Sequence, residues 1–368
     1  MSLKILLKRA AALATAAVFA AATSASACTG IMLKTADGSI VQGRTVEFGI
    51  VIPSQAALAP RGYSFTGETP LGPGKQWTAK YAAVGVIAFD NLAMLDGLNE
   101  KGLAVGTFYF PTFAEYTPTT PENRAASLSM ADFPNWLLTS FATVAEARAA
   151  IEKGDVFIAP TLLKGWPPEL QPFHYVVYDK TGASIAIEPI KGKLVVSDNP
   201  LGVFTNSPPF DWHMTNLRNY IALNPRNVPP ITIDKTVFQP IGQGNGMLGL
   251  PGDFSPPSRF VRAAVFSATA IPEKDAEHGV LQVFHILNNF DIPVGAARDV
   301  SPDGVIHSDY TLLTVARDPQ ALKYYWKSYD DQTIHVVDMN RLDLDSKNVL
   351  KFSTASQQPI IDVTKDLK

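Results

Sequence analysis

The sequence predicts a layered α/β sandwich that forms one large domain. Short β-rich runs fill the first half of the chain, helical patterns lie between and after them, and further strand-like runs follow near the end. Hydrophobic residues make up 46% of the 368 residues and charged residues 18%, which is the composition of a well-cored globular protein. No linker, low-complexity tract or internal repeat divides the chain.

The N-terminus has the pattern of a secretory signal peptide. Lys4, Lys8 and Arg9 precede an uncharged, Ala-rich stretch, and the motif A-S-A follows at residues 25–27. This stretch is shorter than the roughly 20 apolar residues that a membrane-spanning helix needs. We therefore expect residues 1–27 to be removed, and the mature domain, residues 28–368, to be exported to the periplasm or beyond without a membrane anchor.

The first element of the mature chain is a predicted β-hairpin over residues 29–47 that turns at Asp37-Gly38. A two-residue turn there places Cys28 opposite Glu47, and Ile31 opposite Arg44. Strict alternation puts Arg44 and Glu47 on opposite faces of their strand. Both reach Cys28 only if a bulge or the strand end intervenes.

The rest of the chain contains both helix-like and strand-like patterns of apolar residues. Thr143 and Glu146 form a capping box that begins a helix ending near Gly154. Apolar residues at helical spacing predict two more helices, over 258–270 and 276–289. Strands are predicted at 82–89, 103–110, 174–179, 184–188, 194–197, 310–316, 322–328 and 333–338.

Charge and motif content exclude several classes of function. The net charge of −3 and the pI near 6.1 argue against nucleic acid or an anionic membrane as partner. The chain contains no G-x-S-x-G, Walker or H-E-x-x-H motif. Its six histidines are scattered without metal-ligand spacing, so we expect neither a metal nor a cofactor.

The chain has a single cysteine, Cys28, directly after the predicted cleavage site at Ala27. Three interpretations compete. The first is a lipoprotein, although a lipobox usually has Leu where Ala25 stands. The second is a small buried residue that happens to open a strand. The third is an N-terminal nucleophile, in which the thiol attacks and the α-amino group of the same residue acts as the base.

The chemistry of an N-terminal cysteine suits this third interpretation. An α-amino group has a pKa of about 7.7–8.0, close to the operating pH that favours a general base. The amine and the thiol belong to one residue, so little ordering entropy is needed to align them. While Ala27 is attached, the nitrogen of Cys28 is an amide and cannot act as a base. We therefore expect the precursor to be inactive.

Ordered motifs along the mature chain resemble those of the choloylglycine hydrolases, the penicillin V acylases and bile salt hydrolases of the N-terminal nucleophile superfamily. The opening C-T-G-I-M-L-K-T-A-D-G-S-I-V-Q-G-R is similar to the first hairpin of that family. Four later motifs are similar to family landmarks in the same order: D-G-L-N-E-K-G-L-A (96–104), F-Y-F-P (108–111), T-N-S-P-P-F-D-W-H-M-T-N-L-R-N-Y (205–220) and G-L-P-G-D-F-S-P-P-S-R-F-V-R (249–262). The resemblance implies a four-layer αββα sandwich and a homotetramer.

The resemblance also implies roles for five residues. Cys28 is the nucleophile, and Arg44 is the cation that favours its thiolate. Glu47 stands where the family usually has Asp, and we expect it to orient the α-amino group with a longer reach. Asn206 corresponds to the oxyanion residue of the family, and Arg259 to its second arginine.

Tyr109 bears on the substrate, because penicillin V acylases often carry Tyr at the matching place and bile salt hydrolases generally carry Asn. This favours a penicillin V acylase, with N-acyl homoserine lactones as a further substrate class and conjugated bile acids as the alternative. Phe48, Tyr109, Phe110 and Phe113 form a candidate aromatic wall for the acyl group. The alternative from another class is a periplasmic binding protein or lipoprotein that uses the same pocket without catalysis.

Overall fold

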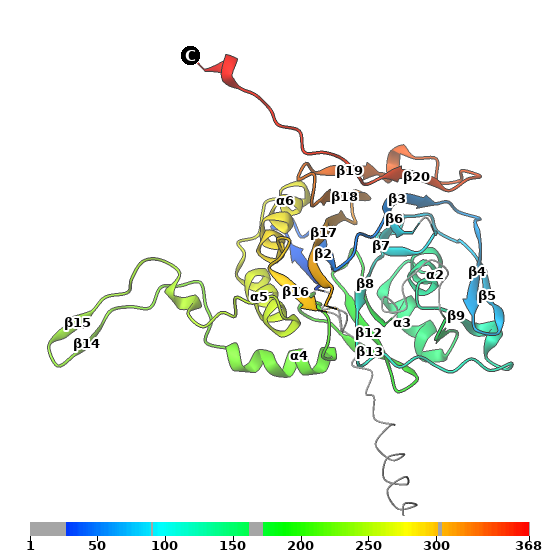
Figure 1. Cartoon of the computed structure of the whole chain (residues 1–368), viewed down its shortest axis with the longest axis horizontal. Helices are drawn as coiled ribbons and strands as arrows, with labels where there is room; N and C mark the ends of the chain where they lie inside the picture. The colour runs from blue at the N-terminus through cyan, green and yellow to red at the C-terminus, as the bar shows by residue number, and fades with distance from the viewer. Residues whose placement is uncertain (1–26, 90, 162–171, 301–303, 368) are drawn as a thin grey trace, which may run out of the picture.

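Two large antiparallel β-sheets lie face to face, and helices cover their outer faces (Figure 1). The computed structural model describes residues 27–89, 91–161, 172–300 and 304–367. The first sheet has the order β1-β2-β17-β18-β19, with β16 paired to β17. The second has the order β13-β12-β11-β8-β7-β6-β3-β20. The predicted αββα sandwich of N-terminal nucleophile hydrolases is therefore confirmed.

The strands of the first sheet are β1 (Thr29–Lys34), β2 (Ile40–Phe48), β16 (Ala297–Val300), β17 (Ile306–Asp318), β18 (Lys323–Ser328) and β19 (His335–Asp338). Those of the second are β3 (Ser54–Ala59), β6 (Ala83–Ala88), β7 (Met94–Asn99), β8 (Ala104–Tyr109), β11 (Phe173–Tyr178), β12 (Ser184–Ile190), β13 (Lys193–Asp198) and β20 (Leu350–Ser353). Two-stranded pairs are formed by β4 (Ser64–Thr69) with β5 (Gly72–Thr78), β9 (Ser127–Ser129) with β10 (Phe157–Ala159), and β14 (Ile231–Ile233) with β15 (Thr236–Phe238).

The helices are α2 (Asp132–Ser140), α3 (Val144–Lys153), α4 (Phe210–Asn216), α5 (Pro256–Thr269) and α6 (Ala276–Leu287). Short 3₁₀ turns are η1 (Arg124–Ala126), η3 (Leu217–Tyr220), η4 (Asn245–Met247), η5 (Asn288–Phe290), η6 (Met339–Arg341) and η7 (Thr364–Asp366). Helices α5 and α6 pack on the first sheet, and α2 and α3 pack on the second. Each predicted strand and helix is present with its ends within a few residues of the expected ones.

The capping signals act as predicted in α3. The Thr143 side chain accepts a hydrogen bond from the Glu146 N–H, and Gly154 ends the helix with a φ of 81°. Helix α5 begins at Pro256 and Pro257. Proline lacks an N–H, but the N–H groups of the first turn have no acceptor within the helix, so no hydrogen bond is lost there.

The first hairpin forms, but its register differs by one residue from the predicted one. Thr29 pairs with Thr45, and the Thr35 N–H donates to Ser39 O at 2.9 Å, which leaves a three-residue loop in place of a two-residue turn. Gly38 closes this loop with a φ of 89°. A type I turn followed by a left-handed glycine is the usual geometry of a three-residue hairpin loop. The D-G pair thus marks the turn but does not fix its length.

The corrected register leaves Arg44 and Glu47 on opposite faces of β2, as alternation requires. Arg44 donates from Nη1 to Thr107 O of β8, across the space between the two sheets. Glu47 accepts a hydrogen bond from the Thr311 hydroxyl of β17. The bulge that we anticipated lies on β17, between Thr311 and Leu313, and not on β2. Cys28 directly precedes β1, and Arg44 and Glu47, from opposite faces of β2, both line the pocket that contains it.

Three apolar layers separate the four layers of the sandwich. Between the sheets, Arg317 of β17 donates from Nε to Asp96 Oδ1 at 3.0 Å, and its Nη2 forms an ion pair with Asp96 Oδ2. The Tyr324 hydroxyl donates to the same carboxylate at 2.9 Å. This buried cluster joins β7 to β17 and β18. Of these residues, only Asp96 lies in a motif that the sequence analysis identified.

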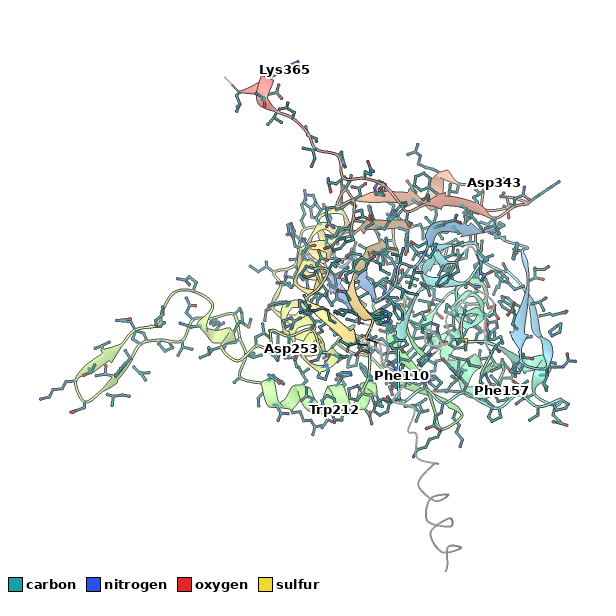
Figure 2. The ribbon with its side chains drawn as sticks, in the orientation of Figure 1. Phe110, Phe157, Trp212, Asp253, Asp343 and Lys365 are labelled. Atoms are coloured by element: carbon teal, nitrogen blue, oxygen red, sulfur yellow. The ribbon has the colours of Figure 1, made fainter. Side chains whose placement is uncertain are left out.

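Two segments extend away from the sandwich. Residues 221–250, which carry β14 and β15, form a long arm at the left of Figure 1, and the C-terminal segment after β20 leaves the body at the top of the view. The arm exposes large apolar side chains, among them Ile231, Phe238 and the fully exposed Ile241. Figure 2 shows the side chains of the arm standing clear of the body.

Candidate active site

Cys28 lies in a pocket formed where the two sheets meet near the end of β1. The residue is 4% exposed, and the pocket has a mainly apolar lining. In the full-length chain the nitrogen of Cys28 is a peptide nitrogen, and it stands where the α-amine of a processed chain would be. The lining residues are Cys28, Arg44, Val46, Glu47, Phe48, Ile52, Leu95, Thr107, Tyr109 and Phe173.

Asn206 is bonded to the nitrogen of Cys28. Its Oδ1 accepts from Cys28 N at 2.7 Å and from Arg259 Nη2 at 2.7 Å, and its Nδ2 donates to Tyr109 O at 2.8 Å. The guanidinium can only donate and the Tyr109 carbonyl can only accept, so these contacts fix the orientation of the amide. The resemblance implied an oxyanion role for Asn206, and the structure adds a bond to the cysteine nitrogen.

Arg259 connects the first turn of α5 to the start of β1. Its Nη1 donates to Cys28 O and, at 3.0 Å, to Thr29 Oγ1, while Nε donates to Phe254 O at 2.8 Å. The side chain is fully buried, and burial lowers the pKa of the Arg259 guanidinium to about 10, against the attraction of Glu47 and Cys28. Arg259 remains charged at neutral pH and holds the segments of Cys28 and Asn206 together.

Arg44 approaches the pocket from the face of β2 opposite to Glu47. Its Nη1 donates to Thr107 O at 2.5 Å and to Leu95 O at 3.4 Å, and Nε donates to Thr45 O at 3.0 Å. The guanidinium carbon lies 4.2 Å from the centre of the Phe108 ring. The side chain is 1% exposed and lines the same pocket as Cys28.

Glu47 is a buried carboxyl at the end of β2. Burial raises the pKa of Glu47 to about 8, and the nearby Arg259 guanidinium opposes that rise. Glu47 Oε1 accepts from the Thr311 hydroxyl at 3.2 Å, and Glu47 lines the pocket beside Cys28. The acceptor bonded to the cysteine nitrogen is Asn206 Oδ1, so the orienting role expected of Glu47 stays a prediction.

The four predicted wall aromatics divide into two pairs. Phe48 and Tyr109 line the pocket, edge to face, with ring centres 5.7 Å apart. Phe110 and Phe113 are not among the lining residues of this pocket. The Phe110 ring stacks on His174 at 4.1 Å and on Phe113 at 5.7 Å. The reason is local, because successive residues at the end of β8 point to opposite faces of the sheet.

Sequence reasoning missed two further residues, one that lines the pocket and one whose charge interacts with Arg259. Phe173 lines the pocket because β11 pairs with β8 in a register that sets Phe173 against Tyr109. Asp309 of β17 is 4% exposed, and burial and, to a smaller extent, Asp299 raise its pKa to about 7, against the attraction of Arg259. Both depend on strand pairing between distant segments, which leaves no local signal.

Among the described residues, no group of three or more His, Cys, Asp or Glu is arranged to hold a metal ion. In the same part of the chain, every helix is too short or too polar to cross a membrane. The pocket presents the Cys28 thiol, the Arg44 guanidinium, the Glu47 carboxyl and apolar walls, and Arg259 donates to the backbone of Cys28 from outside the lining. These are the groups that acyl transfer from an amide to a thiol requires.

Comparison with known proteins agrees with this chemistry. The family of linear amide C–N hydrolases, choloylglycine hydrolase family, matches residues 28–352. A bile salt hydrolase/transferase of Clostridium perfringens is 33% identical over 327 residues, which cover 88% of this chain and 96% of the relative. A penicillin V acylase of Pectobacterium atrosepticum is 30% identical over 285 residues, which cover 73% of this chain and 69% of the relative.

A solved structure extends the likeness to the fold. The R-to-L variant of the conjugated bile acid hydrolase from Clostridium perfringens superposes with a TM-score of 0.80 at 31% identity, covering 91% of this chain and 100% of that one. The chain thus has the fold and the sequence of hydrolases that act on non-peptide C–N bonds. It belongs to the choloylglycine hydrolase family of linear amide C–N hydrolases.

Proposed function

We propose that the mature chain hydrolyses the amide bond of conjugated bile acids through an acyl-enzyme on Cys28. The observation that carries this proposal is the pocket in which Cys28 and the buried Arg44 guanidinium lie beside apolar walls, with the buried Arg259 bonded to the backbone of Cys28. Apolar walls of this kind suit a hydrocarbon acyl group whose amide carbonyl is presented to the thiol. The bile salt hydrolase among the relatives supports this substrate better than the penicillin V that Tyr109 favoured.

In the proposed reaction the Cys28 thiol transfers its proton to the α-amine and attacks the amide carbonyl. The carbonyl oxygen takes up the electron pair and becomes an oxyanion, which the second Nδ2–H of Asn206 and Arg44 stabilise. The oxyanion then collapses, the C–N bond breaks, and the protonated amine gives its proton to the leaving nitrogen. Water attacks the thioester in the same manner, releases the acid and restores the thiol.

Penicillin V is the second candidate substrate, and a specific contact supports it. Phe48 and Tyr109 meet edge to face in the pocket, where a phenoxyacetyl ring can pack against them. N-acyl homoserine lactones present a flexible acyl chain to the same apolar walls, and they form a third class to be compared.

We propose further that residues 1–27 direct export and are removed, which frees the α-amine of Cys28. Ala27 is 5% exposed, so its removal also opens space beside the thiol.

We propose that the exposed apolar arm of residues 221–250 binds a second copy of the chain in an assembly, expected to be a tetramer. Light scattering of the wild type against an Ile231→Ser, Phe238→Ser variant tests this, because the variant should dissociate; an unchanged mass would rule the arm out.

One experiment tests the proposed activity. The chain is prepared with residues 1–27 attached and with Cys28 as its first residue, and each form is assayed on glycocholate, penicillin V and an acyl homoserine lactone. The processed form should release glycine from glycocholate, and the unprocessed form should not. Release from none of the three substrates refutes the proposal and favours a binding protein. Faster turnover of penicillin V selects the second candidate.

A further inference from the structure

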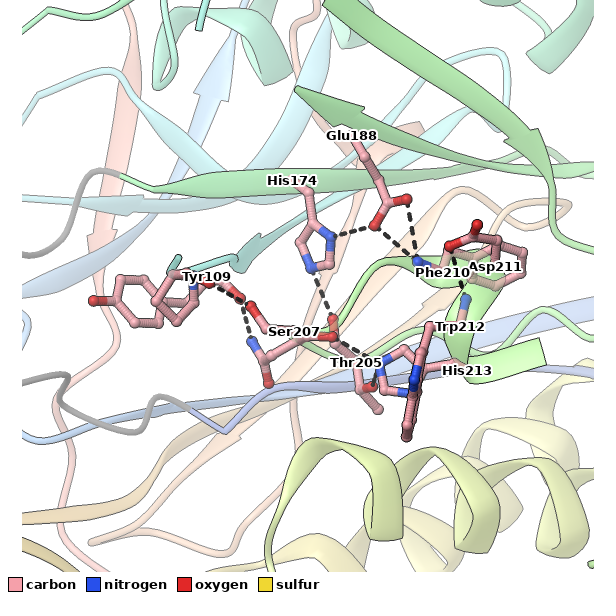
Figure 3. Close-up of polar contacts among 11 residues, drawn as sticks. Tyr109, His174, Glu188, Thr205, Ser207, Phe210, Asp211, Trp212 and His213 are labelled. Carbon is pink, nitrogen blue, oxygen red and sulfur yellow. Dashed lines mark hydrogen bonds and ion pairs between the residues drawn. The ribbon is translucent and has the colours of Figure 1, made fainter. Parts of the chain in front are cut away.

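A network of two histidines and one glutamate contacts the backbone of the segment that carries Asn206. His174 Nε2 lies 2.9 Å from Thr205 O, and His213 Nε2 lies 2.9 Å from Asn206 O. Two imidazoles therefore contact two consecutive carbonyls of the backbone (Figure 3). The sequence alone favoured ordinary core or surface roles for both histidines.

The acceptors in this network determine where its hydrogens lie. Thr205 O accepts only, so His174 Nε2 carries a hydrogen. His174 Nδ1 is 3.1 Å from Glu188 Oε1, and a proton lies between these two atoms, whichever of them holds it more closely. Glu188 also accepts from the Phe210 N–H, at 3.0 Å to Oε1 and 3.1 Å to Oε2. Glu188 thereby joins His174 to the start of α4.

His213 completes the arrangement from α4. Because Asn206 O accepts only, His213 Nε2 carries its hydrogen, and burial lowers the pKa of His213 to about 4, so the ring is neutral at ordinary pH. The ring stacks on Phe260 of α5 at 4.8 Å. A third bond holds the next residue, since the Ser207 hydroxyl donates to Pro111 O at 2.7 Å.

We infer that His174, Glu188 and His213 are positioning residues that hold the backbone of Thr205 and Asn206, and through it aim the Asn206 amide at Cys28. The inference rests on the proposed function, because the aim of Asn206 matters only if its amide takes part in the reaction. Fixing two successive carbonyls leaves the Asn206 backbone little freedom to rotate. The Asn206 side chain then reaches Cys28 N, Arg259 and Tyr109 O without reorganisation.

Substitutions at His174 separate this role from simple core packing. His174→Phe keeps a flat ring between Phe110 and Phe204, whose ring centres lie 4.1 Å and 4.3 Å away, but it removes the donor to Thr205 O. We expect kcat to fall about 10- to 100-fold with KM within about threefold of the wild type, as for a small misplacement of a group used in the transition state. His213→Phe, which keeps the stack on Phe260, should behave alike.

Substitutions at Glu188 provide the matched pair. In Glu188→Gln, the amide NH₂ can donate to His174 Nδ1 while its oxygen, at the Oε2 position, accepts from Phe210 N, so one bond to each partner is kept. In Glu188→Leu, of similar size, both bonds are lost. We expect Glu188→Gln to retain kcat within about threefold and Glu188→Leu to lose about 10- to 100-fold. If both variants fold, as judged by thermal unfolding, and lose activity equally, the inference is wrong.

A double-mutant cycle tests whether the network acts through Asn206. Asn206→Ala alone should reduce kcat by about 10²- to 10³-fold. If His174 acts by aiming Asn206, then His174→Phe should have little further effect in the Asn206→Ala background. Effects that multiply in full would overturn the inference, because they would mean that His174 acts independently of Asn206.

A failure of the proposed function can be recognised separately. If no substrate is turned over, the rate at which iodoacetamide alkylates Cys28, the only thiol, still reports on the nitrogen that Asn206 holds. His174→Phe should then change the alkylation rate of the processed protein by more than about threefold, and Glu188→Gln should not. Equal rates for the wild type and His174→Phe would refute the positioning role even without an assay of hydrolysis.

Discussion

Replacing Arg259 by Lys separates a contact used in the reaction from one used for stability. Arg259 makes four hydrogen bonds, to Phe254 O, Cys28 O, Thr29 Oγ1 and Asn206 Oδ1. A lysine ammonium is a single point and cannot reach all of them at once. Losing the bond to Asn206 should cost about 1.5–3 kcal/mol, because hydrogen bonds to charged groups fall in that range. That energy corresponds to a decrease of about 10- to 150-fold in kcat/KM.

Arg262 offers a matched control on the same helix. It is 5% exposed, and its Nη1 donates to Pro251 O at 2.8 Å and Asp253 O at 2.6 Å, in the loop that also holds Arg259. Arg262→Lys should lower the free energy of unfolding by about 1–3 kcal/mol, as Arg259→Lys should, because both lose hydrogen bonds from a charged donor to backbone carbonyls. Only Arg259→Lys should lower kcat/KM on glycocholate. The reasoning fails if Arg259→Lys stays within threefold of the wild type, or if both variants lose activity equally.

Three further results are expected. Cys28→Ser should fold but lose at least about 10³-fold in kcat, measured by release of glycine from glycocholate; full activity would exclude the thiol as nucleophile. Asp96→Asn should lower the free energy of unfolding in urea by about 3–5 kcal/mol, because Arg317 stays buried without its charged partner. Tyr324→Phe, which removes one hydrogen bond to the same carboxylate, should lower it by about 1 kcal/mol, and similar losses for the two variants would contradict the ion-pair argument. Burial raises the pKa of Asp309 to about 7, so the stability that this group contributes is complete below about pH 4 and is lost as the pH rises through 7. Asp309→Asn should therefore be more stable than the wild type by about 2–4 kcal/mol at pH 8 and equally stable at pH 4. An equal difference at both pH values would contradict this.

Local signals in the sequence predicted most elements of the fold. Capping at Thr143 and Gly154 fixed both ends of α3, and alternating apolar residues located most strands of the two sheets. The register of the first hairpin could not be predicted in the same way. Asp37-Gly38 is compatible with loops of two or three residues, and the choice depends on the fit of β2 against β17, a strand that begins at residue 306.

The site could be predicted only where its residues lie in motifs. Cys28, Arg44 and Glu47 lie close together in the sequence, and the predicted cleavage site and the first hairpin indicate their chemistry. The pocket walls are different, since Phe173 reaches the pocket only through the pairing of β11 with β8. Phe110 is not among the residues that line this pocket, and its wall role stays a prediction. A motif shows that an aromatic is present, but the pleat of β8 decides which face it occupies.

Two fully buried arginines, Arg44 and Arg317, differ in how their charge is balanced. Arg317 bonds to both oxygens of Asp96, so its charge is neutralised within the core. On the neighbouring strand β2, Arg317 pairs with Gln42, two residues before Arg44. Arg44 nevertheless donates to the carbonyls of Thr45, Leu95 and Thr107.

Carbonyl oxygens satisfy the N–H groups of Arg44 without cancelling its charge, so a positive potential remains at the pocket wall. A core arginine kept only for stability would be expected to resemble Arg317, because an uncompensated charge is costly to bury. The cost at Arg44 is offset when a thiolate or an oxyanion forms beside it. Arg44→Met should therefore reduce the alkylation rate of Cys28 at neutral pH, and it should also lower the free energy of unfolding, because the carbonyls of Thr45 and Thr107 lose their donor. A faster rate in Arg44→Met would show that Arg44 does not favour the thiolate.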